Sequence, residues 1–391
     1  MLIVGNYSMG LRFGGIEVPI SPQMIHSISV TLDVDRILPT FKIALKDATG
    51  ILGEIAPYDK TLNSIDLQFG RSDNPERFNT FKLAVKRRKP DSDRNYTIEG
   101  VLDVPNLLTT VYKRALTGDI KTSIETLATV DMQMTKTEVG ASLSYNKTVI
   151  QPRWTDAKLL NYLSDNLIGR NGETGYHCFV KNVDGEQTLV FKSLDEMLSS
   201  AVKFGFIVAS KPYKDLYPVV EYRIFDNSQL LVDLGAKTQD YGYFNYDTGA
   251  FVESTIDAAD CPALGERTLI DDDNSNNSVF ITGLGRSNDF TTDFGGRVSS
   301  NYYKRVNNFV NIWISTWGME NASPGDVVRL LFGEALARGQ LFQYHLSGYW
   351  MVSRVVHLLG SSFMTSLLLT RNGIDTNFST SLIRAGNLKR K

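Results

Sequence analysis

The first third of the chain alternates apolar and polar residues, which is the period of a strand with one buried face. The alternation is strict over residues 28–34, where Ile28, Val30, Leu32 and Val34 fall on one side. The same period recurs at Phe41, Ile43 and Leu45, at Ile65, Leu67 and Phe69, at Phe81, Leu83 and Val85, and at Tyr96 and Ile98. Residues typical of turns separate these runs, so the pattern predicts an antiparallel sheet of about five strands.

After Leu116 the apolar period lengthens to that of a helix, over residues 120–128 and again over 159–167. Thr155 is a candidate N-cap for the second helix. Beyond it, two short apolar runs flank Asp184-Gly185, which predicts a hairpin. This part of the chain therefore reads as a small α/β unit.

Two further alternating runs, residues 220–224 and 310–314, predict two strands of one sheet. The stretch between them, from about residue 242 to residue 301, is rich in Asp, Asn, Gly and Tyr. Such a composition favours loops, and we expect an insertion there.

The late part of the chain echoes the early part. Residues 63–70 and residues 326–333 both read as strands that end at Phe-Gly, and residues 81–86 resemble residues 349–354. Each second segment is followed by a short turn and a further strand, which begins at Tyr96 in one case and at Phe363 in the other. The repeated order predicts two copies of one β domain.

These patterns predict an α+β fold that is mainly β, with two similar antiparallel β domains, an intervening small α/β domain and an inserted loop-rich domain. The expected ranges are 1–115 for the first β domain, 116–210 for the α/β domain, 211–241 with 305–375 for the second β domain, 242–304 for the insertion and 376–391 for a C-terminal tail.

The composition of the chain does not favour any particular class of binding partner. The chain has 41 basic and 43 acidic residues, a formal net charge of −2, so no global pull toward nucleic acid or an anionic membrane is expected. Neither a secretory signal nor a membrane segment is apparent. Cys178 and Cys261 lie far apart in sequence without metal-site spacing, which fits a reducing cytoplasm during folding.

The order of elements resembles the baseplate hub proteins of contractile-tailed phages and the related hub portion of type VI secretion spike proteins. The matching pieces are the early sheet, the helix after Trp154-Thr155-Asp156-Ala157, the hairpin at Asp184-Gly185, the segment Ser323-Pro324-Gly325-Asp326-Val327-Val328, the segment from Leu346 to Val352, His357, and a last strand from Phe363 to Leu369. The resemblance covers most of the chain as an order of elements.

The resemblance implies a homotrimeric ring in which two β domains per chain match a sixfold tail tube to a threefold spike, in a virion assembled in the host cytoplasm. The expected partners are the tail tube protein, a separate central spike protein, other baseplate proteins and, as a further candidate, the tape measure protein. Genomic DNA would pass through the lumen without specific binding, and no membrane is involved.

Assembly surfaces, in this interpretation, are expected at the repeated strands and at the densest basic run. The residues are Ile65, Leu67, Phe69, Lys86, Arg87, Arg88, Asp326, Val328, Leu330 and Phe332. The basic run also reads as a solvated hairpin end, because Asp91 and Asp93 follow it.

Two other functions stay open. A tail-tip or adhesin-like protein could bind cell-surface carbohydrate through the aromatic-rich stretch from Tyr241 to Phe251. Cell-wall hydrolysis is less favoured, because His177 and Cys178 point to opposite faces of a strand and no other catalytic group emerges. His26, His345 and His357 lack metal-ligand spacing, and Asp271-Asp272-Asp273 departs from a calcium loop. We expect no cofactor, no metal and no enzymatic activity.

Overall fold

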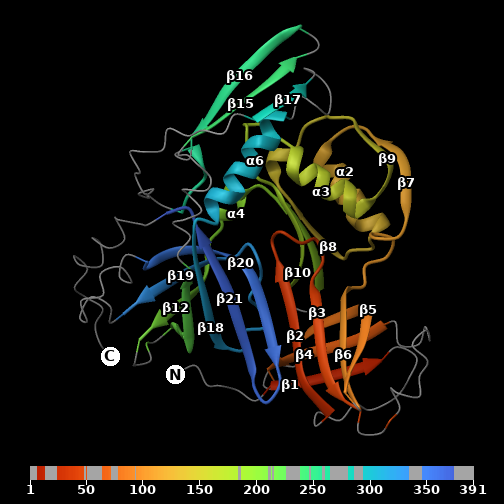
Figure 1. Cartoon of the computed structure of the whole chain (residues 1–391), viewed down its shortest axis with the longest axis vertical. Helices are drawn as coiled ribbons and strands as arrows, with labels where there is room; N and C mark the ends of the chain where they lie inside the picture. The colour runs from red at the N-terminus through yellow and green to blue at the C-terminus, as the bar shows by residue number, and fades with distance from the viewer. Residues whose placement is uncertain are drawn as a thin grey trace.

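The fold is mainly β, with few helices, as the sequence predicts (Figure 1). Among the residues that the structure describes, one branched sheet of 13 strands is the largest element, and two three-stranded sheets and a two-stranded ribbon accompany it. The computed structural model describes residues 7–13, 24–47, 50, 64–71, 78–92, 94–183, 186–209, 213, 215–225, 238–245, 248–257, 260–264, 281–285, 294–333 and 346–373. The expected tail 376–391, His345 and the acidic loop at Asp271 lie outside these residues.

The first half of the large sheet is a five-stranded antiparallel unit. Its strands are β2 (Ile25–Asp33), β3 (Thr40–Lys46), β4 (Ser64–Arg71), β5 (Asn79–Ser92) and β6 (Asn95–Leu102). They pair in the spatial order β4-β5-β6-β3-β2, and β1 (Tyr7–Phe13) adds to the outer edge of β4. Most apolar residues of the alternating runs are buried on one face, and Val85 and Tyr96 are half-buried against it, which accounts for the period of two seen in the sequence.

The second half repeats this unit. Its strands are β14 (Glu221–Phe225), β18 (Val310–Trp317), β19 (Val327–Phe332), β20 (Gly348–Leu359) and β21 (Phe363–Arg371). They pair as β19-β20-β21-β18-β14, all antiparallel, which is the order of the first half. The internal repetition inferred from the sequence is therefore confirmed in the pairing of the strands.

Each unit has a β-bulge at the same place, and the two bulges show which residues of the units correspond. The β5–β6 ladder shifts between Val85 and Arg87, and the β20–β21 ladder shifts between Val352 and Arg354. Each bulge therefore inserts one residue, Lys86 in β5 and Ser353 in β20. Matching the bulges aligns β4 with β19 so that Phe69-Gly70 corresponds to Phe332-Gly333, as the sequence predicts. The match expected between residues 81–86 and 349–354 is shifted by one residue.

The two units join inside the chain through β2 and β20, which run antiparallel from Ile28 opposite Leu359 to Asp33 opposite Arg354. The Arg354 guanidinium makes two 2.7 Å contacts with Oδ2 of Asp33, through Nε and Nη2. At the other end of this junction the Phe69 ring lies 5.5 Å from the Phe363 ring and 5.3 Å from that of His357. The junction therefore has an ion pair at one end and an aromatic cluster at the other.

The small α/β part lies between β6 and β12. Its elements are β7 (Val111–Leu116), α2 (Ile120–Thr126), a π-helical turn (Leu127–Asp131), β8 (Lys136–Val139), a 3-10 turn (Ala141–Leu143), β9 (Val149–Thr155), α3 (Asp156–Asn166), β10 (His177–Val183), β11 (Glu186–Lys192) and α4 (Leu194–Leu198). Thr155 caps α3 by accepting from the Lys158 amide, and β10 pairs with β11, so the predicted cap and hairpin are confirmed.

Strand β12 (Val202–Val208) falls within the range expected for the small domain, yet it pairs in parallel with β19 of the large sheet. The short β13 (Tyr217–Pro218) pairs with β12 in turn. These two strands extend the edge of the second unit, because β19 leaves that edge open to further pairing.

The insertion between β14 and β18 has its own sheet and helix. It contains β15 (Thr238–Asn245), β16 (Ala250–Asp257), β17 (Ile281–Gly285) and α6 (Phe294–Asn307). The ribbon of β15 and β16 projects from the top of the molecule, and α6 lies beside α3 (Figure 1). Lys304 of α6 forms an ion pair of 3.2 Å with Asp165 of α3. The elements start before residue 242 and end after residue 304, the limits expected from composition.

Candidate functional site

The apolar residues expected at an assembly surface lie in the core of the chain. They are Ile65, Leu67 and Phe69 of β4, and Val328, Leu330 and Phe332 of β19, all buried. The Phe69 ring also stacks on Phe81 of the next strand, with ring centroids 5.9 Å apart. These side chains therefore act within the described chain by holding each repeat together, and only the outward residues between them, such as Asp66 and Gln68, face solvent.

Asp326 is also held inside the chain. Its carboxylate accepts from the Ser323 amide at 2.8 Å and pairs with Lys203 at 2.9 Å, which closes the turn before β19. Burial raises the pKa of Asp326, while Lys203 acts in the opposite direction. Gly325 in this turn has a φ of +80° and faces Phe179, so a side chain there would be strained. Asp326 therefore fixes a turn.

The basic residues Lys86, Arg87 and Arg88 lie in the middle of β5, which continues to Ser92, so the expected hairpin end is wrong. The sequence could not show this, because the bulge at Lys86 interrupts the alternation without a characteristic residue. By placing an extra residue in the strand, the bulge brings both Lys86 and Arg87 to the solvent side.

An open hollow of about 350 Å³ lies on this solvent side of the first repeat. Its lining comes from four adjacent strands and combines small polar side chains with charged ones. The lining residues are Ser29, Thr31, Thr40, Phe41, Lys42, Lys86, Arg87, Glu99, Gly100 and Val101. Lys42 lies 3.8 Å from Glu99, and both are exposed, so this contact contributes little to stability. Three cations and one carboxylate give the hollow a local positive charge.

The hollow belongs to a face that continues across both repeats. Strand pairing places Arg87, Glu99, Lys42 and Ser29 in one row across β5, β6, β3 and β2. The row continues through Leu358 of β20, Met364 of β21 and Trp317 of β18. Leu358 and Trp317 are exposed at 42% and 38%. This row thus changes from charged residues in the first repeat to apolar residues in the second, and we call the face that carries the row the outward face.

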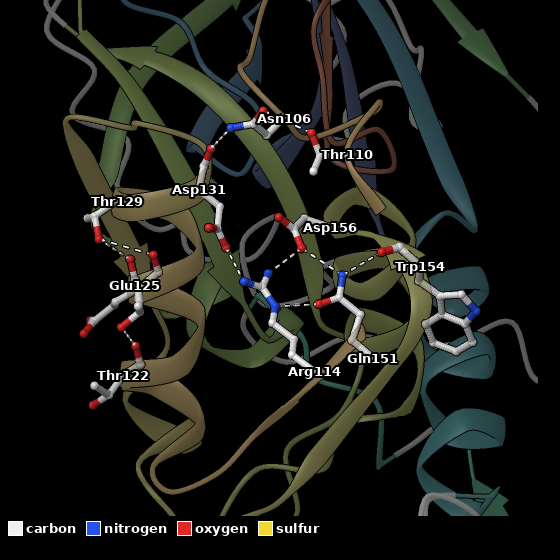
Figure 2. Close-up of polar contacts among 11 residues, drawn as sticks. Asn106, Thr110, Arg114, Thr122, Glu125, Thr129, Asp131, Gln151, Trp154 and Asp156 are labelled. Carbon is white, nitrogen blue, oxygen red and sulfur yellow. Dashed lines mark hydrogen bonds and ion pairs between the residues drawn. The ribbon is translucent and has the colours of Figure 1, made fainter. Parts of the chain in front are cut away.

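A buried polar network links the elements of the small α/β part (Figure 2). The Arg114 guanidinium pairs with Asp131 at 2.8 Å and with Asp156 at 2.7 Å, and it donates to Gln151 at 2.8 Å. Gln151 also donates to Asp156 at 2.9 Å. Burial raises the pKa of Asp156, although Gln151 and Arg114 act in the opposite direction. The network joins β7, β9, the π-helical turn and the start of α3, so it fixes their packing.

Among the described residues, the histidine and cysteine pair considered in the sequence is not arranged for nucleophilic chemistry. Cys178 is buried, and burial raises the pKa of its thiol to about 12, which disfavours the nucleophilic thiolate. The neighbouring His177 lies 3.3 Å from Asp35 rather than beside the thiol. His357 is buried against aromatic rings, its Nδ1 lies 3.3 Å from the Thr365 hydroxyl, and burial lowers its pKa to about 3. Within the described ranges, no group of three His, Cys, Asp or Glu side chains is placed to hold a metal.

The aromatic stretch expected to suit carbohydrate forms the projecting ribbon. Phe244 of β15 lies opposite Phe251 of β16, and both are exposed. In the described part of the chain, no helix is long and apolar enough to cross a membrane.

No protein-family model matches the sequence, and no curated protein sequence matches it either. Solved structures do match over almost the whole chain. A tail protein from Neisseria meningitidis MC58 aligns with a TM-score of 0.61 and 12% identity, over 94% of this chain and 97% of its own. A 43 kDa tail protein of prophage MuSo2 from Shewanella oneidensis aligns with a TM-score of 0.57 and 11% identity, over 95% of this chain and 100% of its own.

A third match is the Escherichia coli c3393 protein, a type VI secretion system component with structural similarity to the T4 bacteriophage tail proteins gp27 and gp5. Its TM-score is 0.52 at 11% identity, over 92% of this chain and 76% of its own. Identities this low establish the fold alone. The resemblance drawn from the sequence is confirmed at that level, because the chain has the fold of phage tail proteins and of a type VI secretion component.

Proposed function

We propose that this chain is the structural hub of a phage tail baseplate, a homotrimeric ring that connects a sixfold tail tube to a threefold central spike. The observation that carries the proposal is the repeated five-stranded unit with its bulge in the same place. Two such units per chain give six similar lobes in a ring of three chains, which is the number needed to face a sixfold tube. Cyclic closure of identical chains is a common way to build such a ring.

The proposed role is non-enzymatic and is located in the tail of the virion, after assembly in the host cytoplasm. The partners are the tail tube protein, the central spike protein and other baseplate proteins, with the tape measure protein as a further candidate. DNA would pass through the lumen during ejection without specific contacts. The near-neutral charge of the chain is compatible with such passage, because a strongly basic lining would retain phosphates.

The proposal is tested by electron microscopy and mass measurement of the purified chain, alone and mixed with the proteins of neighbouring genes. A ring of three chains with six lobes and a central hole is the expected result. Monomers in every mixture would refute the proposal.

A second candidate is binding of cell-surface carbohydrate at the projecting ribbon, favoured by the exposed pair Phe244 and Phe251. Its test is glycan binding by the chain and by a Phe251→Ser variant. Binding that this variant loses, by a chain that stays monomeric, would favour the second candidate over the hub.

A further inference from the structure

The strand junction inside the chain provides a template for a junction between chains. β19 pairs with β20 from Gly348 to Met351 and then leaves it, and β2 takes over the same edge of β20 from Arg354 onward. The edge of β20 is therefore shared between its own repeat and the other repeat. The large sheet is continuous across the two repeats for this reason.

The bulges identify which residues of the two repeats correspond. In the first repeat, Val30, Phe41, Gly100 and Val85 form one row that ends just before the bulge. In the second repeat, the matching row is Ile224, Ile312, Leu369 and Val352. β14 is therefore the equivalent of β2, and β5 is the equivalent of β20.

The same correspondence places Arg87 where the second repeat has Arg354, since each is the residue after its bulge. Arg354 holds Asp33 across the junction inside the chain. A second junction of the same kind would place Arg87 where Arg354 lies, and the position of Asp33 would fall at residue 227, an asparagine outside the described residues. The environment of Arg87 is the solvent-facing hollow, so its guanidinium is accessible to a second chain.

Each chain also presents the two strand edges that such a junction needs. β4 pairs with β5 only as far as Ala84, just as β19 pairs with β20 only as far as Met351. At the other end of the sheet, β14 pairs with β18, and no second strand joins β14 among the described residues. A strand edge of this kind is a template for pairing with another chain.

We infer that β14 of one chain pairs with the distal half of β5 in a second copy, antiparallel and in the register of β2 with β20. Because Thr31 opposes Val356 inside the chain, Phe225 of one copy opposes Lys89 of the next. The contact is heterologous and closes a ring when each copy uses one edge of each kind. The inference rests on the proposed ring and adds the surfaces that close it.

Pro90 and a second register shift after it mark where the correspondence between β5 and β20 ends. Proline has no amide hydrogen to donate, so the chain-to-chain ladder is shorter than the ladder inside the chain. The joint between copies consequently depends more on side chains, and Arg87 is the side chain in the equivalent position. This asymmetry makes the joint between chains weaker than the junction within one chain.

The test is disulfide trapping in the chain assembled with its neighbouring tail proteins. The pair Phe225→Cys with Lys89→Cys places two thiols directly opposite each other, at a spacing of about 5 Å that a disulfide can bridge. Thr31→Cys with Val356→Cys is the matched control, since it repeats the geometry inside one chain. Phe225→Cys with Arg87→Cys is the control for register, two residues away along the strand. The native cysteines are both buried.

Covalent dimers and trimers from the first pair, an internal disulfide from the matched control and little product from the shifted pair are the expected result. A three-chain ring without cross-linking of Phe225→Cys to Lys89→Cys would overturn the inference and leave the proposed function standing. Monomers in every mixture would overturn both. Preferential cross-linking of the shifted pair within a ring would overturn the register.

Discussion

Removing Arg354 should loosen the junction between the two repeats. The substitution Arg354→Met keeps most of the side-chain volume and removes two 2.7 Å contacts to Asp33, whose side chain is only 5% exposed. The Asp33 carboxylate would then keep the backbone amide of Asp35, at 3.0 Å, as its described partner. A buried carboxylate without its cation is costly, so the free energy of the native junction should rise.

The magnitude follows from the exposure of the two partners. Breaking a fully buried ion pair from one side costs about 3–5 kcal/mol, and breaking an exposed pair costs about 0–1 kcal/mol. Because the Arg354 side chain is 41% exposed, water can replace part of the lost interaction. We therefore expect a cost of about 2 kcal/mol, which corresponds to about a 30-fold change in an opening equilibrium.

Hydrogen exchange is the assay, since it reports the opening of individual elements rather than of the whole chain. Amides of β2 and β20 should exchange about 30-fold faster in Arg354→Met, whereas those of β10 and β11 should change little. Lys42→Met is the matched control, because Lys42 contacts Glu99 at 3.8 Å with both groups exposed. Equal effects of the two substitutions, or additivity of Arg354→Met with Asp33→Asn, would refute the reasoning.

Three further predictions follow from other elements. Phe69→Ala should destabilise the chain by about 3–5 kcal/mol in urea unfolding, whereas Gln68→Ala on the outward side should cost less than about 0.5 kcal/mol; similar effects would contradict the burial of β4. Because burial lowers the pKa of His357 from 6.5 to about 3, the unfolded chain binds the extra proton, and stability should fall by about 2 kcal/mol from pH 6.5 to 4.5; His357→Asn should lack that part of the fall, and an unchanged pH profile would refute it. Arg87→Met should weaken self-association at least tenfold by analytical ultracentrifugation, while Lys113→Met should not, and an equal effect of both would count against a specific role for Arg87.

Sequence patterns predicted the repeated strands because the strands of the first repeat alternate strictly and because the dipeptide Phe-Gly recurs at Phe69-Gly70 and at Phe332-Gly333, near the ends of β4 and β19. They misaligned β5 with β20 by one residue because the bulge residues, Lys86 and Ser353, share no chemistry that marks a bulge. A bulge is a property of the ladder between two strands, so a single strand's sequence shows it only weakly.

The candidate site shows a different limit. The alternating pattern correctly predicted that Ile65, Leu67 and Phe69 share one face of a strand. Such a pattern does not show whether that face packs in the core of the chain or against another protein. The outward face was missed because it is assembled from strands far apart in sequence, such as Trp317 of β18 and Arg87 of β5. Only the junction of β2 with β20 brings these positions into one row.

The insertion between β14 and β18 has a consequence for symmetry. In the first repeat the equivalent link, between Asp33 and Thr40, is a short turn, whereas in the second it carries β15, β16, β17 and α6. In a ring of three chains, these inserted elements would therefore lie on every second lobe, while the five-stranded unit would occur six times. Such a ring would have threefold symmetry in the inserted elements and approximate sixfold symmetry in the strands of the repeats. A single gene would thereby encode both symmetries, because only one of two otherwise matching repeats carries the insertion.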